Sequence, residues 1–189
     1  MSIVAAEREY VDHAEPWTER EYLALGETQQ RVELIDGSLL MTPAPNGGHQ
    51  RISRKLANLL DDAVPDDAEI FEAVNVRLAE DRILIPDIVV TRECADLFSY
   101  RPEKIILVAE LVSPSTKAQD RVFKPRLYAA AGIPWYLLVE LEDDDRVELG
   151  LHRRSGDTYV EQQRAGVGEQ LHVEEPEAVI DVKALLRRR

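Results

Sequence analysis

The chain has 189 residues, of which 44% are apolar and 31% are charged, and its net charge is −13. This composition is typical of a single globular domain and excludes a disordered chain. The longest uncharged run, at 127–139, is 13 residues long, whereas a membrane span needs about 20 apolar residues. The single cysteine, Cys94, excludes an internal disulfide, so the expected location is the cytoplasm.

Charge is unevenly distributed along the chain. Residues 61–72 contain six acidic side chains and no basic one, whereas 49–60 and 115–126 are locally basic. Nonspecific nucleic-acid binding by bulk charge is disfavoured by the acidic total, because such binding comes from cations that neutralise phosphates. The simplest interpretation of the basic stretches is that they form solvated faces of two helices.

The first half of the chain predicts two helices and four strands. Thr18 and Glu21 form a capping box for a short helix that Gly26 can end. Asp36-Gly37 separates two apolar runs, at 31–35 and 38–42, and predicts a β-hairpin. Apolar residues at 52, 56, 59 and 60 have helical spacing. One strand is predicted at 69–78 and another at 83–91, with a turn between them.

The second half is centred on a continuous apolar run at 105–109, which predicts a central strand covered on both faces. A helix ending at Gly132 and a second buried strand at 135–141 complete a strand–helix–strand crossover. Strands near 146–153 and 158–164 predict a β-meander. We therefore expect a flexible segment at 1–16 and one α/β domain at 17–189, built on a mixed β-sheet.

Two carboxylates are placed where predicted strands leave the core. Asp87 follows Pro86 at the head of an apolar run, and Glu110 ends the central strand. A hard cation such as Mg²⁺ takes oxygen ligands at about 2.1 Å, and two carboxylates on neighbouring strands can supply them. The structural alternative is that these acids cap strands or pair with arginine. Glycine-rich phosphate loops, paired zinc ligands and a Gly-x-Ser-x-Gly turn are absent from the sequence.

An ordered set of residues around these acids resembles the bacterial Uma-two family, within the PD-(D/E)xK nuclease superfamily. The resemblance covers about residues 17–180 and implies a restriction-endonuclease-like fold, with a mixed β-sheet core flanked by helices and additional hairpins or a meander. The matching residues are Glu33-Leu34-Ile35-Asp36-Gly37, His49, Pro86-Asp87, Glu110-Leu111-Val112, Ser113-Pro114-Ser115-Thr116, Asp120-Arg121, Lys124, Tyr128 and Gly132-Ile133-Pro134.

The resemblance implies a metal site for Mg²⁺ or Mn²⁺. Asp87 and Glu110 match the two acidic ligands, and the carbonyl of Leu111 matches a third. The superfamily's lysine position is occupied by Val112, but Lys124 matches the place to which the family moves this lysine, on the helix after the strand. Because Pro125 is tolerated only in a first turn, we expect the regular helix to begin near Lys124.

Several further residues are candidates for accessory roles. Glu33 and His49 are candidate contacts to the metal, a water or a phosphate, although His49 is equally well explained as a helix-start residue that bonds nearby backbone. Asp120 is better explained as a capping or orienting group. Tyr128, Trp135 and Tyr136 lie in apolar runs and are expected in the core. The candidate DNA contacts are Arg51, Lys117, Arg121 and Arg126.

Together these features predict a metal-dependent endonuclease that hydrolyses phosphodiester bonds in DNA. One alternative, favoured by the acidic charge, is a catalytically silent nuclease-fold module with a binding or regulatory role. Another is a metal-dependent hydrolase of a small, nucleotide-like substrate, which would need no basic groove. The sequence is compatible with a homodimer.

Overall fold

The computed structural model describes residues 15–26, 28, 30–95, 97–112, 119–143 and 146–186, and for 119–120 and 142–143 it describes the backbone only. All but the last two residues of the predicted flexible segment at 1–16 lie outside this part of the chain. Within it, no helix is long and apolar enough to cross a membrane.

The N-terminal elements form as the sequence predicts. Helix α2 (Glu19–Ala24) begins after Thr18, and the capping box between Thr18 and Glu21 is present. Strands β1 (Arg31–Ile35) and β2 (Ser38–Thr42) pair as an antiparallel hairpin. Its turn residues Asp36 and Gly37 have φ values of 50° and 81°, the left-handed conformations that a two-residue hairpin turn requires.

Helix α3 (Gly47–Asp61) confirms the helical spacing of its apolar residues. Asn46 caps it, since its side-chain oxygen accepts the His49 backbone N–H at 2.9 Å. Ile52, Leu56 and Leu60 are buried against the main sheet. The opposite side of the helix therefore carries the polar residues of its first turns towards solvent.

Two predicted strands are each divided in the structure, so these predictions were wrong. The segment at 69–78 forms β3 (Glu69–Glu72) and β4 (Asn75–Ala79), and that at 83–91 forms β5 (Arg82–Leu84) and β6 (Ile88–Thr91). Ala73, at φ 54°, breaks the first, and Pro86, which lacks an N–H for the ladder, lies at the break in the second. The Ala73 N–H donates to the Asp87 carbonyl at 3.2 Å, so the two breaks lie side by side.

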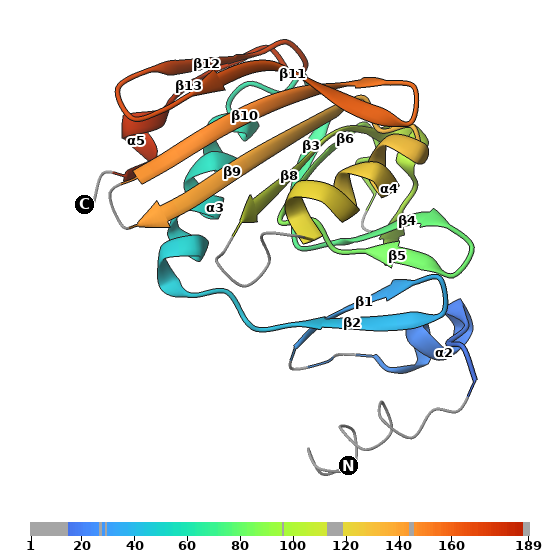
Figure 1. Ribbon diagram of the computed structural model, residues 1–189. Helices are drawn as coiled ribbons and strands as arrows, with labels where there is room; N and C mark the ends of the chain where they lie inside the picture. The colour runs from blue at the N-terminus through green and yellow to red at the C-terminus, as the bar shows by residue number, and fades with distance from the viewer. Residues whose placement is uncertain are drawn as a thin grey trace.

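A six-stranded mixed sheet forms the centre of the molecule, in the order β11-β10-β9-β8-β6-β3 (Figure 1). The predicted central strand is β8 (Ile105–Val112), which is buried throughout. It runs parallel to β9 (Trp135–Asp143) through the crossover helix α4 (Lys124–Ala130), as expected. The meander is also confirmed, and its strands are β10 (Arg146–Ser155) and β11 (Thr158–Ala165).

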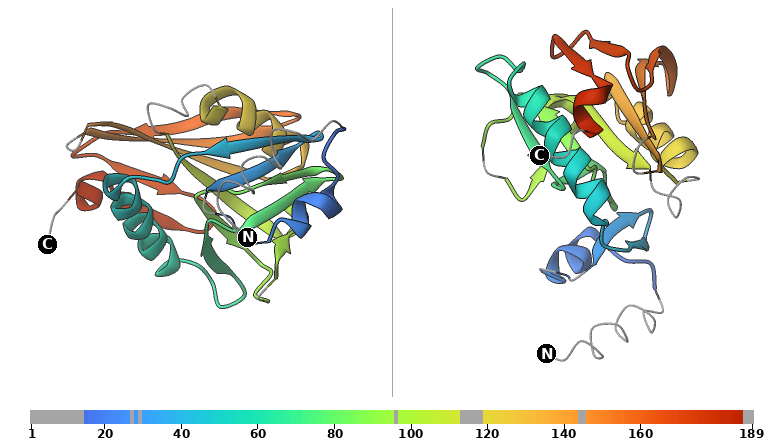
Figure 2. Two further views of the ribbon diagram at one scale, coloured as in Figure 1. Left: turned by 90° about the horizontal axis from the view of Figure 1, so that it is seen from below. Right: turned by 90° about the vertical axis from the view of Figure 1, so that its left-hand side faces the viewer.

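The remaining strands form two smaller sheets. One has the order β2-β1-β5-β4-β7, where β7 is Ser99–Tyr100 and precedes a short 3-10 helix, Pro102–Lys104. The other is the hairpin of β12 (Gln170–Val173) and β13 (Ala178–Asp181), followed by α5 (Val182–Leu186). The three views place α2, β1 and β2 at one end of the molecule and α5 with β12 and β13 at the other (Figures 1 and 2).

The main sheet has a separate apolar core on each face. Helices α3 and α5 with the β12–β13 hairpin pack on one face, and α4 with β4 and β5 packs on the other. Side chains alternate along β8, so Leu107, Ala109 and Leu111 face the α3 side while Val108 and Val112 face the α4 side. Glu110 has the same parity as Val108 and Val112 and therefore points towards α4.

Candidate active site

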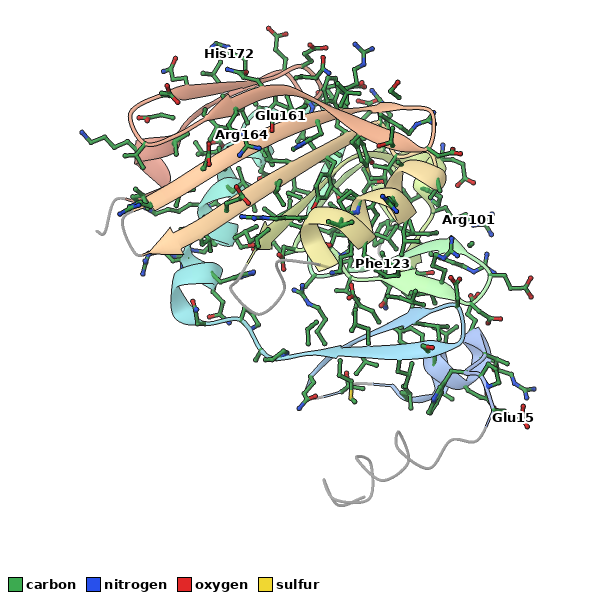
Figure 3. The ribbon with its side chains drawn as sticks, viewed as in Figure 1. Glu15, Arg101, Phe123, Glu161, Arg164 and His172 are labelled. Carbon is green, nitrogen blue, oxygen red and sulfur yellow. The ribbon has the colours of Figure 1, made fainter. Side chains whose placement is uncertain are left out.

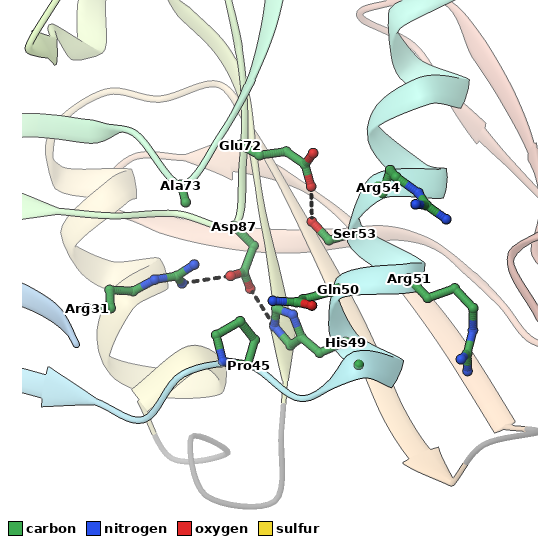
Figure 4. A pocket seen from close by; sticks show the side chains of 11 residues that line it. Arg31, Pro45, His49, Gln50, Arg51, Ser53, Arg54, Glu72, Ala73 and Asp87 are labelled. Carbon is green, nitrogen blue, oxygen red and sulfur yellow. Dashed lines mark hydrogen bonds and ion pairs between the residues drawn. The ribbon is translucent and has the colours of Figure 1, made fainter. Parts of the chain in front are cut away.

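Asp87 lies in the second of these breaks, directly ahead of β6, and its side chain is 4% exposed. Its Oδ1 accepts a hydrogen bond from Arg31 Nη1 at 2.7 Å. Its Oδ2 lies 3.3 Å from His49 Nε2 and accepts the backbone N–H of Leu111 at 2.8 Å. Strands β1 and β8 and helix α3 thus all contribute to the environment of one carboxylate (Figure 4).

These donors keep Asp87 ionised despite its burial. Burial by itself would raise the pKa of this carboxyl, but the hydrogen bond from His49, the charges of Arg31 and His49 and the Leu111 N–H outweigh it and lower the pKa to about 2. Hydrogen bonds and opposite charges favour the charged form of a carboxylate. Asp87 is therefore an anion with both carboxylate oxygens held in place.

Glu110 lies on β8, the strand next to β6. The register pairs Ile88 with Ala109, which sets Glu110 beside Asp87 at the end of the two strands. Glu110 is 1% exposed, and its Oε1 accepts hydrogen bonds from Lys124 Nζ at 3.1 Å and from the Tyr128 hydroxyl at 2.6 Å. Burial, followed by the charges of Glu110 and Glu33, raises the pKa of Tyr128 well above its usual value, so its hydroxyl stays a donor.

Lys124 is the first residue of α4 and follows a π-helical turn at Gln119–Phe123, as the position of Pro125 predicts. It is 3% exposed, and its Nζ also lies 3.1 Å from Oε1 of Glu33. Glu33, on β1, is fully buried, and the same oxygen accepts the Ile85 N–H at 2.7 Å. Its other oxygen, Oε2, is buried without a hydrogen-bond partner in the described part of the chain.

Three carboxylates and two permanently charged cations therefore lie in one region of the structure. Glu33, Asp87 and Glu110 supply the negative charges, and Arg31 and Lys124 supply the positive ones. The charges of Asp87, Glu110 and Glu33 keep the pKa of Arg31 above its usual value, although burial opposes this. A buried charge is tolerated only when it is paired, so the cations hold the three acids together.

A pocket of about 580 Å³ opens beside Asp87. Figure 4 shows Arg31 and Asp87 on one side and the first turns of α3 on the other, where Ser53 bonds Glu72 at 2.6 Å. The lining of this pocket is rich in basic side chains, although the whole chain is acidic. The lining residues are Arg31, Pro45, Gly47, His49, Gln50, Arg51, Ser53, Arg54, Glu72, Ala73 and Asp87.

The structure brings together five of the residues that the sequence singled out: Glu33, His49, Asp87, Glu110 and Lys124. The His49 imidazole contacts Asp87, and only its backbone N–H serves the helix start. The backbone N–H of Leu111 bonds Asp87, while a metal contact from its carbonyl stays a prediction. The catalytic roles of these residues also stay predictions.

The candidate DNA contacts are more scattered. Arg51 lines the pocket, and Arg126 is exposed on α4. Arg121 is paired with Glu140, so the charge of Arg121 is already compensated. Glu140 also contacts Arg164 at 3.4 Å. Figure 3 shows Arg164 beside Glu161, over the outer strands of the main sheet. Lys117 and the side chain of Asp120 lie outside the described residues.

Two contacts were missed from the sequence. Arg31 pairs with Asp87, and Tyr128, which was expected in the core and is fully buried, also bonds Glu110. Each of these residues has a recognisable spacing from a candidate site residue. Arg31 is two residues before Glu33, which puts both on one face of a strand, and Tyr128 is four residues after Lys124, which puts both on one face of a helix. That spacing relative to a candidate catalytic residue is the signal that could have identified them.

The donor set suits a hard divalent cation. Asp87 and Glu110 offer carboxylate oxygens, and Glu33 adds a buried oxygen without a hydrogen-bond partner among the described residues. Mg²⁺ usually binds through one or two carboxylates and keeps several waters. The described residues contain no ready-made group of three or more His, Cys, Asp or Glu ligands, so a metal held by three of these side chains would require them to rearrange.

A mixed sheet with helices on both faces and a buried Asp, Glu and Lys at one strand end is a restriction-endonuclease-like fold. Residues 19–183 match the Uma-two family, which is described as "Putative restriction endonuclease", and the chain belongs to this family. A crystal structure described as a "putative nuclease" from Anabaena variabilis has 18% identity and a TM-score of 0.70, and the match covers 90% of this chain and 98% of that one. This likeness shows the fold. None of the curated proteins matches the chain.

Proposed function

We propose that the protein is a Mg²⁺- or Mn²⁺-dependent endonuclease that hydrolyses phosphodiester bonds in DNA. The observation that carries this proposal is the position of Lys124, whose buried ammonium lies 3.1 Å from both Glu110 and Glu33. A lysine fixed among carboxylates at the end of a strand pair, next to Asp87, which lines an open pocket, combines the cation and the metal ligands that the reaction needs. The family match supports a nuclease.

Phosphodiester hydrolysis needs an activated water, stabilisation of charge on the phosphoryl oxygens, and alignment of the attacking and leaving groups. A divalent ion held by Asp87 and Glu110, with the Leu111 carbonyl as a further ligand, would lower the pKa of a water and neutralise phosphoryl charge. Tyr128 donates to Glu110 and fixes the orientation of its carboxylate. Leu111 and His49 do the same for Asp87.

The lysine supplies a positive charge at a fixed point. Lys124 Nζ is held by two carboxylates in a buried site, where an electrostatic interaction is stronger than in water. Its ammonium is therefore placed to stabilise negative charge that develops on a phosphoryl oxygen. In the same proposal Arg51 and Arg54, on the far wall of the pocket, bind phosphates of the strand on either side of the scissile bond.

The test is cleavage of supercoiled plasmid, linear duplex and single-stranded DNA with Mg²⁺ or Mn²⁺. We expect nicking or linearisation of plasmid that EDTA stops and that Asp87→Asn abolishes. Asp36→Asn is the matched control, because Asp36 is an exposed aspartate that pairs with Arg82 in the β1–β2 turn. A folded wild-type protein that leaves all three DNA substrates intact in both metals would contradict the proposal and favour a silent nuclease-fold module.

A further inference from the structure

The contact between Arg31 and Asp87 places a cation where a metal would have to bind. Arg31 Nη1 lies 2.7 Å from Asp87 Oδ1. His49 and the Leu111 N–H both contact the other oxygen, Oδ2. Within the described residues, Arg31 is the partner that the structure gives Oδ1, so this oxygen becomes a metal ligand only if the guanidinium moves.

Electrostatics makes the two cations mutually exclusive at this oxygen. The Arg31 guanidinium remains charged at any pH of interest. A divalent ion about 2.1 Å from Oδ1 would lie against this guanidinium, and like charges at such a distance in a buried site repel strongly. Lys124 is different, because it contacts Glu33 and Glu110 rather than Asp87.

Arg31 also has space into which it can move. Its side chain is 19% exposed, compared with 4% for Asp87, and it lines the pocket whose far wall carries Arg51 and Arg54. Its backbone is fixed, since Arg31 pairs with Thr42 in the β1–β2 hairpin, so movement is confined to the long, flexible side chain. Figure 4 shows this side chain reaching Asp87 from β1 along the edge of the pocket.

A released guanidinium in this pocket would meet the groups that suit a phosphate. The planar fork of an arginine matches phosphate oxygens in a two-bond geometry. Arg51 and Arg54 of α3 also belong to the pocket lining, and the Nε of Arg51 is buried without a hydrogen-bond partner among the described residues. Once a metal neutralises Asp87, three arginines in the lining stand against one acid, Glu72, and this excess of positive charge favours an anion.

We propose that Arg31 is an exchangeable counter-ion of Asp87. A divalent metal replaces Arg31 on Asp87, and the released guanidinium then binds a phosphate of the DNA in the pocket beside Asp87. This inference rests on the proposed function. It makes metal binding and DNA binding mutually reinforcing, because each ligand favours the same position of Arg31. It also explains why the acids are neutralised without a metal, since Arg31 and Lys124 together balance most of their charge.

The direct test measures Mn²⁺ binding to the DNA-free protein by calorimetry. In wild type the metal must displace Arg31, whereas in Arg31→Met it need not. We expect Arg31→Met to bind Mn²⁺ on the order of tenfold more tightly, within the usual range of coupling between two sites. Arg82→Met is the matched control, because Arg82 is paired with Asp36 in the β1–β2 turn and does not line the pocket; its Mn²⁺ affinity should equal that of wild type.

Asp87→Asn separates failure of this inference from failure of the proposed function. If Asp87→Asn binds Mn²⁺ as wild type does, or if wild type binds none, the metal site itself is wrong and the exchange falls with it. If Asp87→Asn loses Mn²⁺ while Arg31→Met binds it no more tightly than wild type, the exchange alone is overturned and the nuclease site stands.

Arg31→Met leaves buried acids with one cation fewer, so its stability in EDTA should fall. The rise in Tm on adding Mn²⁺ then gives the second readout, and it applies even to a variant that is partly unfolded without metal. Exchange predicts a larger Mn²⁺-induced rise for Arg31→Met than for wild type. An equal or smaller rise would contradict it.

The DNA half of the proposal is tested in a Lys124→Met background, chosen because cleavage should be slow there. Mn²⁺ should tighten binding of a short duplex to Lys124→Met, and removing Arg31 as well should reduce this enhancement several-fold, within the range of coupling energies between sites. An undiminished enhancement in the double variant would show that the released arginine does not contact DNA and would overturn this half of the proposal.

Discussion

Lys124 and Glu110 are 14 residues apart in sequence, yet Lys124 Nζ lies 3.1 Å from Glu110 Oε1. The contact forms because α4 packs on the face of the main sheet towards which Glu110 points, and Lys124 is the first residue of that helix. Val112, two residues beyond Glu110 on the same face, is buried in the apolar core. The ammonium beside Glu110 is thus supplied by the first residue of a helix and not by a residue of the strand itself.

Replacement of this lysine should affect the chemical step. If Lys124 stabilises phosphoryl charge, Lys124→Met should lower the cleavage rate under saturating DNA by a factor on the order of 10² to 10³, as when one donor is removed from a preorganised site. Mn²⁺ affinity should not fall, because a neighbouring positive charge has been removed. Lys104→Met, at an exposed lysine, is the control. Parental cleavage by Lys124→Met would exclude the catalytic role.

Local sequence signals predicted the elements that depend on local structure. The Asp36-Gly37 turn fixed the β1–β2 hairpin, and the apolar run at 105–109 identified the central strand. The crossover followed from two buried strands around one helix. In each case the residues that determine the element are adjacent or regularly spaced, so one segment of sequence contains the information.

The divided strands and the Arg31 contact could not be predicted in the same way. Segments 69–78 and 83–91 each contribute to two different sheets, and apolar patterns do not reveal which sheet a residue joins. The positive φ at Ala73 has no local signal, because alanine rarely adopts it. Arg31 reaches Asp87 across 56 residues of sequence, so that pairing depends on how the sheets pack.

Tyr128 should contribute measurably to the stability of the site. Its hydroxyl donates to the Glu110 carboxylate at 2.6 Å, and hydrogen bonds to charged groups are worth about 1.5–3 kcal/mol. Tyr128→Phe should therefore lower the free energy of unfolding by about 2 kcal/mol, measured by urea denaturation in EDTA. Tyr100→Phe is the control, since its buried hydroxyl bonds the neutral Ala95 carbonyl, and it should cost less. Equal losses would argue against a charged Glu110.

Asp87 should make stability depend on acid pH. Its pKa is about 2 when folded, against about 3.9 when unfolded, so the unfolded chain takes up protons first as the pH falls. The stabilisation is therefore present above about pH 4 and is lost as the pH falls through about 2. In EDTA, the stability of wild type relative to Asp87→Asn should fall by about 2 kcal/mol between about pH 5 and about pH 2. A constant difference over this range would contradict the lowered pKa.

Arg121, in the π-helical turn, and Arg126, in α4, should differ in their contribution to DNA binding. Arg126 is exposed and has no ion pair among the described residues, whereas Arg121 is paired with Glu140. A phosphate contact releases counterions and adds about 0.9 to the slope of log affinity against log salt. If Arg126 contacts DNA, Arg126→Ala should weaken duplex binding and reduce this slope by about that amount. Arg121→Ala should change the slope less, because Glu140 already neutralises the charge of Arg121.

Both slopes can be measured by fluorescence anisotropy with a labelled duplex over a series of salt concentrations. The measurement uses proteins that also carry Lys124→Met, in which cleavage should be slow. A larger decrease for Arg121→Ala than for Arg126→Ala would show that DNA displaces Glu140 from Arg121, and the phosphate contact would then lie over the π-helical turn.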